Sequence, residues 1–153
     1  MSDTTFTSSV PFDPDRFDGI AVYCSDGRFG QQCDEFLRRQ LGLSRVDRLV
    51  VPGGAGALVD HDKARLEATG LLDELAFLAE AHRLNHVVLI NHQQCGFYLG
   101  RPGVEPGELE ALQKRDLAAA AERVRALPQI ERVDAYLACS EDGAVRFAAV
   151  ETA

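Results

Sequence analysis

Short apolar runs that alternate with segments of helical periodicity most constrain how this chain can fold. Residues 20–23 and 87–90 are continuously apolar, which is typical of strands that are covered on both faces. Between them, residues 33–41 carry apolar side chains at helical spacing, and Gly42 follows as a helix stop. Strands that alternate with helices predict an α/β fold with a mostly parallel sheet.

The full pattern predicts an open sheet with helices on both faces and a strand order of about 2-1-3-4 plus an edge strand. The expected strands are residues 19–24, 46–51, 86–90 and 133–139, and the expected helices are residues 33–41, 62–84 and 109–127. A last strand at 145–150 follows the short turn Glu141-Asp142-Gly143, so we expect it to be antiparallel and at the edge. Residues 96–107, rich in Gly and Pro, are expected to form a loop.

The first 18 residues differ from the rest. Residues 1–18 are rich in Ser, Thr, Asp and Pro and predict an irregular N-terminal arm, followed by one α/β zinc-binding domain over residues 19–153. The apolar side chains of the arm are expected to pack either on the chain's own core or on a partner chain. They are Phe6, Val10, Phe12 and Phe17.

The charge balance excludes several classes of partner. The chain has 16 Lys and Arg against 24 Asp and Glu, a net charge of −8, and no basic tract, so we expect neither nucleic acid nor a membrane as a partner. Residues 1–5 have no basic start and no apolar run, so no secretory signal is expected and the predicted location is cytoplasmic. In that compartment thiols stay reduced, and spaced cysteines indicate metal binding or catalysis more often than disulfides.

Two polar segments follow the strands that flank the expected switch in strand order. Cys24-Ser25-Asp26-Gly27-Arg28 comes directly after the first strand, and His92-Gln93-Gln94-Cys95 comes directly after the third. Ligands of open parallel sheets bind beyond the carboxyl ends of the strands at this point. The two segments are therefore expected to lie side by side.

Cys24, His92 and Cys95 are a ligand set that suits Zn²⁺ in a tetrahedral site. The fourth position is either open for water or filled by Asp26. Zinc lowers the pKa of a bound water toward about 7 and so supplies hydroxide. Arg28 can form a bidentate pair with Asp26, which would keep this carboxylate off the metal. If the pair breaks, Asp26 can close the site, so this segment can encode an open and a closed state.

With these two segments the sequence resembles a β-class carbonic anhydrase. A small-residue turn at residues 53–56 stands between them, as in that family. The resemblance implies reversible hydration of CO₂ to bicarbonate, with zinc on Cys24, His92 and Cys95. Hydroxide on the zinc would attack the carbon, and Asp26 and Arg28 would orient and gate it, or Asp26 would be the fourth ligand of a resting form. It also implies a homodimer or a higher homo-oligomer.

The sequence also departs from the family pattern. Pro52-Gly53 stands where an Arg-Asn pair is usual, Gln93 replaces a Ser or Thr, and no match is found for the Gln that contacts bicarbonate. Two alternatives follow from these departures: a hydrolase of COS or CS₂, and a non-catalytic zinc-binding or regulatory protein. A third, independent alternative is an enzyme with Cys24 as its nucleophile. Several other residues are expected to be structural, capping or on the surface. They are Cys33, His61, His82, His86 and Cys139.

Overall fold

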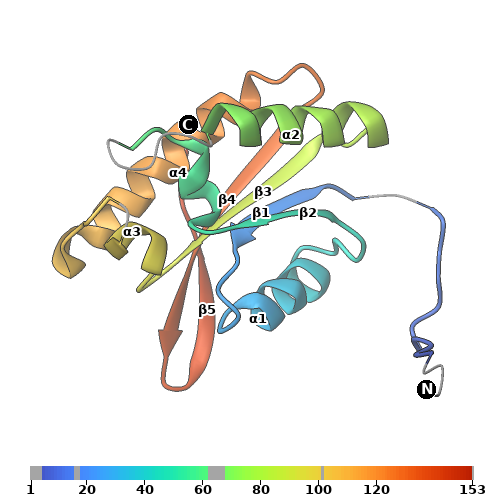
Figure 1. Ribbon diagram of the computed structural model, residues 1–153, viewed down its shortest axis with the longest axis horizontal. Coiled ribbons are helices and arrows are strands. Elements are labelled where there is room, and N and C mark those ends of the chain that lie inside the picture. The colour runs from blue at the N-terminus through green and yellow to red at the C-terminus, as the bar shows by residue number, and fades with distance from the viewer. Residues whose placement is uncertain (1–4, 16–17, 62–67, 101, 153) are drawn as a thin grey trace.

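The computed structural model describes residues 5–15, 18–61, 68–100 and 102–152, and its centre is a five-stranded sheet (Figure 1). Its strands are β1 (Ile20–Cys24), β2 (Asp47–Val51), β3 (His86–His92), β4 (Arg132–Glu141) and β5 (Ala144–Ala149). The order is β2-β1-β3-β4-β5. The first four strands are parallel, and β5 pairs antiparallel with β4. The predicted order and the antiparallel edge strand are both confirmed.

Helices cover both faces of this sheet, as predicted (Figure 1). α1 (Gly30–Glu35), which continues as a π-helical segment (Phe36–Gln40), lies on one face, and α2 (Ala68–His82) and α4 (Leu109–Arg125) lie on the other. The predicted helix at 62–84 is observed from Ala68, because residues 62–67 are outside the described part of the chain.

The expected loop at residues 96–107 is partly helical, and that expectation was wrong. It contains the short helix α3 (Gly96–Gly100) and a 3₁₀ turn (Pro106–Glu108). Phe97 and Tyr98 are buried, so apolar burial overrides the loop tendency of the flanking glycines. Within the described ranges, no helix has both the length and the hydropathy needed to cross a membrane.

The core has one layer on each side of the sheet because successive strand residues point to opposite faces. Ile20 and Val22 of β1 pack into the layer under α2 and α4, whereas Ala21 and Tyr23 pack toward α1. All five residues of β1 are buried. This central strand therefore holds its last residue, Cys24, at a fixed place on the carboxyl edge of the sheet.

The small-residue turn at residues 53–56 forms part of a 3₁₀ helix (Gly54–Leu58) that packs tightly against α3. Gly53 has a φ of 87°, a left-handed conformation that glycine adopts without strain, and a side chain there would overlap the ring of Phe97. A side chain at Gly56 would overlap the hydroxyl group of Tyr98. These contacts leave room only for glycine at both positions.

We expect Gly56→Ala to lower the free energy of unfolding by about 1–3 kcal/mol, the usual cost of overpacking a core. Tyr98 is fully buried and donates a hydrogen bond of 2.7 Å to Asp116, so it cannot easily move away from a new methyl group. Gly70→Ala in α2 is the control, since nothing lies within 4 Å of the new methyl. That change should stabilise by about 0.5–1 kcal/mol. Urea unfolding of both variants measures the difference, and equal effects would contradict the packing argument.

The N-terminal arm extends away from the sheet over residues 5–15, with no helix or strand (Figure 1). Phe6 and Phe12 are 89% and 90% exposed, and Val10 is also exposed. These three side chains therefore do not pack on the chain's own core, which was one of the two alternatives. Phe17 lies outside the described residues. Packing on a partner chain, and the division into an arm and one domain, stay predictions.

Candidate metal centre

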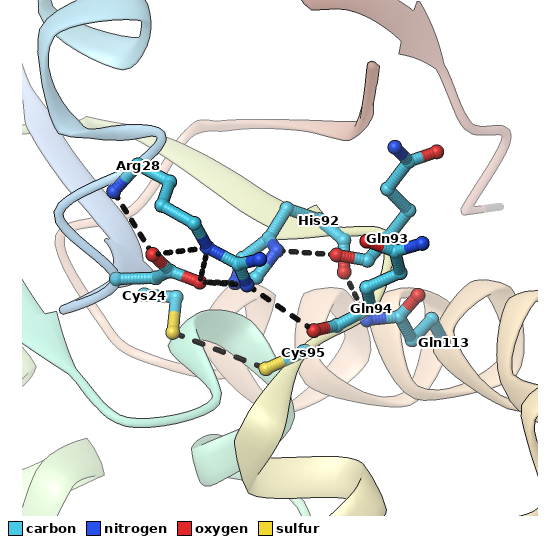
Figure 2. Close-up of polar contacts among 8 residues, drawn as sticks. Cys24, Arg28, His92, Gln93, Gln94, Cys95 and Gln113 are labelled. Carbon is cyan, nitrogen blue, oxygen red and sulfur yellow. Dashed lines mark hydrogen bonds and ion pairs between the residues drawn. The ribbon is translucent and has the colours of Figure 1, made fainter.

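The structure brings Cys24, His92 and Cys95 together at the carboxyl edge of the sheet (Figure 2). Cys24 is the last residue of β1, His92 is the last residue of β3, and Cys95 directly precedes α3. Their ligand atoms all lie within 4.8 Å of one another, and the two sulfur atoms are 3.9 Å apart. All three residues are buried. The sequence predicted this convergence.

Two features of the backbone cause the convergence. β1 and β3 are parallel neighbours, with Val22 opposite Leu89, so both strands end at the same edge. The chain then turns back at Gln94, which has a φ of 53°. This left-handed conformation is uncommon for a residue with a side chain. The turn brings the Cys95 sulfur to the side chain of His92.

The hydrogen bonds of His92 leave one ring nitrogen available as a ligand. Nδ1 donates to the carbonyl oxygen of Gln93 at 2.6 Å, so Nε2 carries the lone pair of the neutral ring. Nε2 is buried and has no hydrogen-bond partner in the described part of the chain. Phe29 stacks on the imidazole, with ring centroids 4.3 Å apart and planes at 28°. An oriented imidazole with a free inner nitrogen is the usual state of a metal ligand.

The two thiols form a pair that favours a cation. A hydrogen bond from the Cys95 thiol lowers the pKa of Cys24 well below its usual range, and a weaker contribution comes from His92. The same pairing with Cys24, together with burial, raises the pKa of Cys95. The pair therefore holds one proton between two sulfur atoms, and a metal ion could replace that proton. The donor set of two sulfurs and one imidazole fits Zn²⁺.

Asp26 and Arg28 form a bidentate ion pair next to the three ligand atoms. Arg28 Nε lies 3.0 Å from both carboxylate oxygens, and Nη2 lies 2.6 Å from Oδ2. The backbone N–H of Arg28 also donates to Oδ1 at 2.9 Å. These contacts with Arg28 lower the pKa of Asp26 to about 2, so its carboxylate is ionised at neutral pH. Arg28 Nη2 also reaches the Gln94 carbonyl oxygen at 3.5 Å, which links the two segments.

Asp26 is therefore close to the cluster but is paired with Arg28. Its Oδ2 atom is 3.7 Å from His92 Nε2, beyond hydrogen-bond distance. This arrangement agrees with the first of the two roles considered for Asp26, the partner of Arg28. Its role as a fourth ligand stays a prediction for a second, closed state.

Sequence reasoning missed a set of buried polar residues behind the cluster. Gln113 of α4 donates to the His92 carbonyl oxygen at 2.7 Å. Asp116 accepts a hydrogen bond from Tyr98 and lies 3.2 Å from His61, which was expected to be a surface or capping residue. The His61 side chain is 8% exposed, and its Nε2 also lies 3.2 Å from the Gly56 carbonyl oxygen. The available signal was the position of Gln113 and Asp116 on the apolar stripe of α4, where a polar residue needs a buried partner.

The buried pair of His61 and Asp116 predicts a pH dependence of stability. The hydrogen bond to Asp116 is the main reason that the pKa of His61 is raised above 6.5. A raised pKa gives stability that is fully present below the pKa of the unfolded chain and lost as the pH rises through the folded value. The free energy of unfolding of the wild type should therefore exceed that of His61→Gln most at low pH, and the difference should shrink as the pH rises above 6.5. Urea unfolding measures it, and a constant difference would refute the assignment.

Solved structures define the class of this fold as that of the β-carbonic anhydrases. The enzyme CafD of Aspergillus fumigatus superimposes with a TM-score of 0.53 and 13% identity, over 92% of this chain and 94% of that one. A tetrameric β-carbonic anhydrase of Sordaria macrospora gives 0.51 and 11%, over 84% and 78%. The Coccomyxa enzyme, solved with acetazolamide, gives 0.51 and 12%, over 84% and 70%. These identities support the fold alone.

The chain belongs to the family described as "Putative carbonic anhydrase", whose family model matches residues 15–139. It is thus a divergent member of the β-carbonic anhydrase family, as its two ligand segments had indicated. An uncharacterized protein of Rickettsia conorii is 31% identical over 103 residues, which are 67% of this chain. The chain spans 53% of the length of that relative.

Proposed function

We propose that this protein is a zinc-dependent lyase that catalyses the reversible hydration of CO₂ to bicarbonate in the cytoplasm. The observation that carries the proposal is the group of three buried ligand atoms beside the ionised pair of Asp26 and Arg28. Membership in the carbonic anhydrase family supports the same reaction.

Cys24, His92 and Cys95 would hold the zinc ion. The unpartnered Nε2 atom of His92 and the two closely spaced sulfur atoms are the donors that support this assignment. When bound, zinc would lower the pKa of a coordinated water and so supply a nucleophile near neutral pH. Three protein ligands leave the fourth position of a tetrahedral site for water and substrate.

Asp26 and Arg28 would orient the reactants at that fourth position. The ionised carboxylate of Asp26 can accept a hydrogen bond from the nucleophile and fix its direction of attack. Arg28 holds the carboxylate through a rigid fork of N–H donors and so keeps it from binding the metal. The pair would thus act as the gate of the site, open while the two side chains remain joined.

Stopped-flow measurement of CO₂ hydration on zinc-loaded protein tests the proposal. Activity is expected between about pH 7 and about pH 9, and the upper end is included because two thiolates make zinc a weaker Lewis acid. If the protein with one zinc per chain shows no activity over this range, the proposal is wrong. Hydrolysis of COS or CS₂ by the same preparation would then identify the alternative hydrolase. Four protein ligands at every pH would identify a non-catalytic zinc protein.

We also propose that the protein works as a homodimer or a higher homo-oligomer. The arm presents Phe6, Val10 and Phe12 to solvent, and exposed aromatic side chains on an extended segment are suited to a protein interface. Sedimentation equilibrium of the full chain and of the double variant Phe6→Ser, Phe12→Ser tests this oligomeric state. A wild-type monomer would refute it.

A further inference from the structure

Phe29 is a buried aromatic residue that contacts both the proposed metal ligand His92 and the ion pair beside it. It is 6% exposed, and its ring stacks on the imidazole of His92, with centroids 4.3 Å apart and planes at 28°. The guanidinium carbon Cζ of Arg28 lies over the same ring, 5.9 Å from its centroid. A phenyl ring neither binds metal nor exchanges protons, so the proposed reaction assigns Phe29 no role.

The backbone places Phe29 at the junction between the segment of the ion pair and α1. Its N–H donates to the Asp26 carbonyl oxygen at 3.1 Å, which closes a turn over residues 26–29. Its own carbonyl oxygen accepts a helical hydrogen bond from the N–H of Cys33 at 2.9 Å, at the start of α1. Arg28 directly precedes Phe29 in the chain, so the place of the Phe29 ring sets where the Arg28 side chain begins.

The core layer under α1 holds the Phe29 ring in place. Phe29 belongs to the buried cluster that includes Tyr23 of β1 and Ile90 of β3. Because protein interiors are close-packed, a ring in this layer cannot shift freely. The imidazole of His92 is therefore restrained twice: Phe29 lies against one face, and Nδ1 donates to the Gln93 carbonyl oxygen.

The two contacts of the Phe29 ring differ in strength. The contact with His92 joins two buried rings, and such pairs contribute beyond the area that they bury. The Arg28 side chain is 62% exposed, so water competes for its charge, and an exposed cation–π contact changes an equilibrium by roughly two- to fivefold. We therefore expect the orientation of the imidazole to depend on Phe29 more strongly than the ion pair does.

We propose that Phe29 is a positioning residue for the metal centre and for the ion pair beside it. Its ring keeps the imidazole of His92 aimed at the two cysteine sulfur atoms and keeps the Arg28 guanidinium on its carboxylate partner. The Nε2 atom of His92, which has no hydrogen-bond partner among the described residues, is thus oriented before a metal binds, and less ordering is needed on binding. The role toward His92 rests on the proposed function, whereas the role toward Arg28 does not.

Phe29→Leu tests the role toward His92, because leucine keeps an apolar side chain and removes the ring. Competition with a chromophoric chelator on the full-length protein should give a zinc affinity at least about tenfold below that of the wild type, as the loss of a group that orients a ligand usually does. The visible absorption of the cobalt-substituted variant should also change, since these bands depend on ligand geometry. Phe29→Met, whose flexible side chain fills core gaps, is used if Phe29→Leu does not fold.

Arg28 provides a readout that needs no metal. Its Nε–H donates to the Asp26 carboxylate at 3.0 Å, so NMR can follow the opening of this hydrogen bond through exchange of the proton with water. In Phe29→Leu the exchange should be roughly two- to fivefold faster than in the wild type. A loss of core packing alone would leave this rate unchanged, because the Arg28 side chain is largely exposed.

Phe36→Leu is the matched control for both readouts. Phe36 packs against the same core layer and also stacks on a ring, that of Phe147, with centroids 4.2 Å apart and planes at 2°. Its aromatic contacts, Phe147 of β5 and Tyr136 of β4, belong neither to the three-ligand cluster nor to the ion pair. This variant should keep the zinc affinity, the cobalt spectrum and the Arg28 exchange rate of the wild type.

Unchanged zinc affinity and cobalt spectrum in Phe29→Leu would overturn the role toward His92, and an unchanged exchange rate would overturn the role toward Arg28. Equal effects of Phe29→Leu and Phe36→Leu would overturn both, since they would show a general effect of packing. A wild type that binds no zinc would refute the proposed function and with it the role toward His92, whereas the exchange of Arg28 would still decide the other role. None of these measurements uses CO₂ hydration, so an inactive enzyme leaves the test intact.

Discussion

Cys95→Ala is expected to lose zinc binding and much of the stability that the metal provides. Cys95 is 1% exposed, and its sulfur lies 3.9 Å from that of Cys24, so the change removes one of the three clustered ligand atoms. Metal binding is linked to folding because the unfolded chain has no preformed site. A ligand at a thousand times its Kd stabilises by roughly 4 kcal/mol, and this is the loss expected at such zinc concentrations.

Elemental analysis and urea unfolding with and without a chelator measure both effects. Wild type should hold one zinc with two protected thiols, and Cys95→Ala should hold none and respond little to the chelator. Cys24→Ala and His92→Ala should behave in the same way, because each removes one of the three ligand atoms.

Cys33→Ala is the matched control for this experiment. Cys33 is also a buried thiol, 2% exposed, but it lies in α1 and packs in the core layer on that side of the sheet, away from Cys24 and Cys95. Its pKa is raised to about 12, mainly by burial, so it stays protonated. The change should cost about 1 kcal/mol through lost packing and leave the zinc content unchanged. Full zinc in Cys95→Ala, or zinc loss in Cys33→Ala, would contradict the ligand assignment.

The part of this site that could be predicted depends on backbone topology. Cys24 and His92 end two strands that the strand order places side by side, so sequence order and apolar patterning together indicate their proximity. The pairing of Asp26 with Arg28 could also be predicted because only one residue separates them in the chain. Local spacing and parallel strands constrain these contacts before any packing detail is known.

Contacts that depend on how a helix is rotated and positioned could not be predicted. Gln113 reaches His92 only because α4 packs in one particular register over β3. Asp116 contacts His61 across the same layer, although His61 lies 55 positions earlier in the chain. A polar residue on an apolar stripe predicts a buried partner but not its identity.

Asp26→Asn is expected to keep zinc and to lower CO₂ hydration by about 10²-fold or more, as the loss of an acid–base or orienting group usually does. The amide has the same shape, but it carries no charge and accepts through one oxygen only. It can no longer form the bidentate pair in which Arg28 Nε and Nη2 both contact the carboxylate. Zinc content and kcat/KM, measured on the same preparation, separate binding from chemistry.

Asp34→Asn provides the control, because Asp34 also accepts hydrogen bonds from an arginine, Arg48 at 3.2 Å, and lies outside the cluster. It should leave kcat/KM unchanged. Arg28→Lys tests the other half of the pair: an ammonium group cannot reproduce the fork of donors, so Asp26 is freed and activity should fall. If the two residues act as one unit, Asp26→Asn combined with Arg28→Lys costs no more than either change alone. Additive losses in this double-mutant cycle would show that they act independently, and the gate would have to be assigned to other residues.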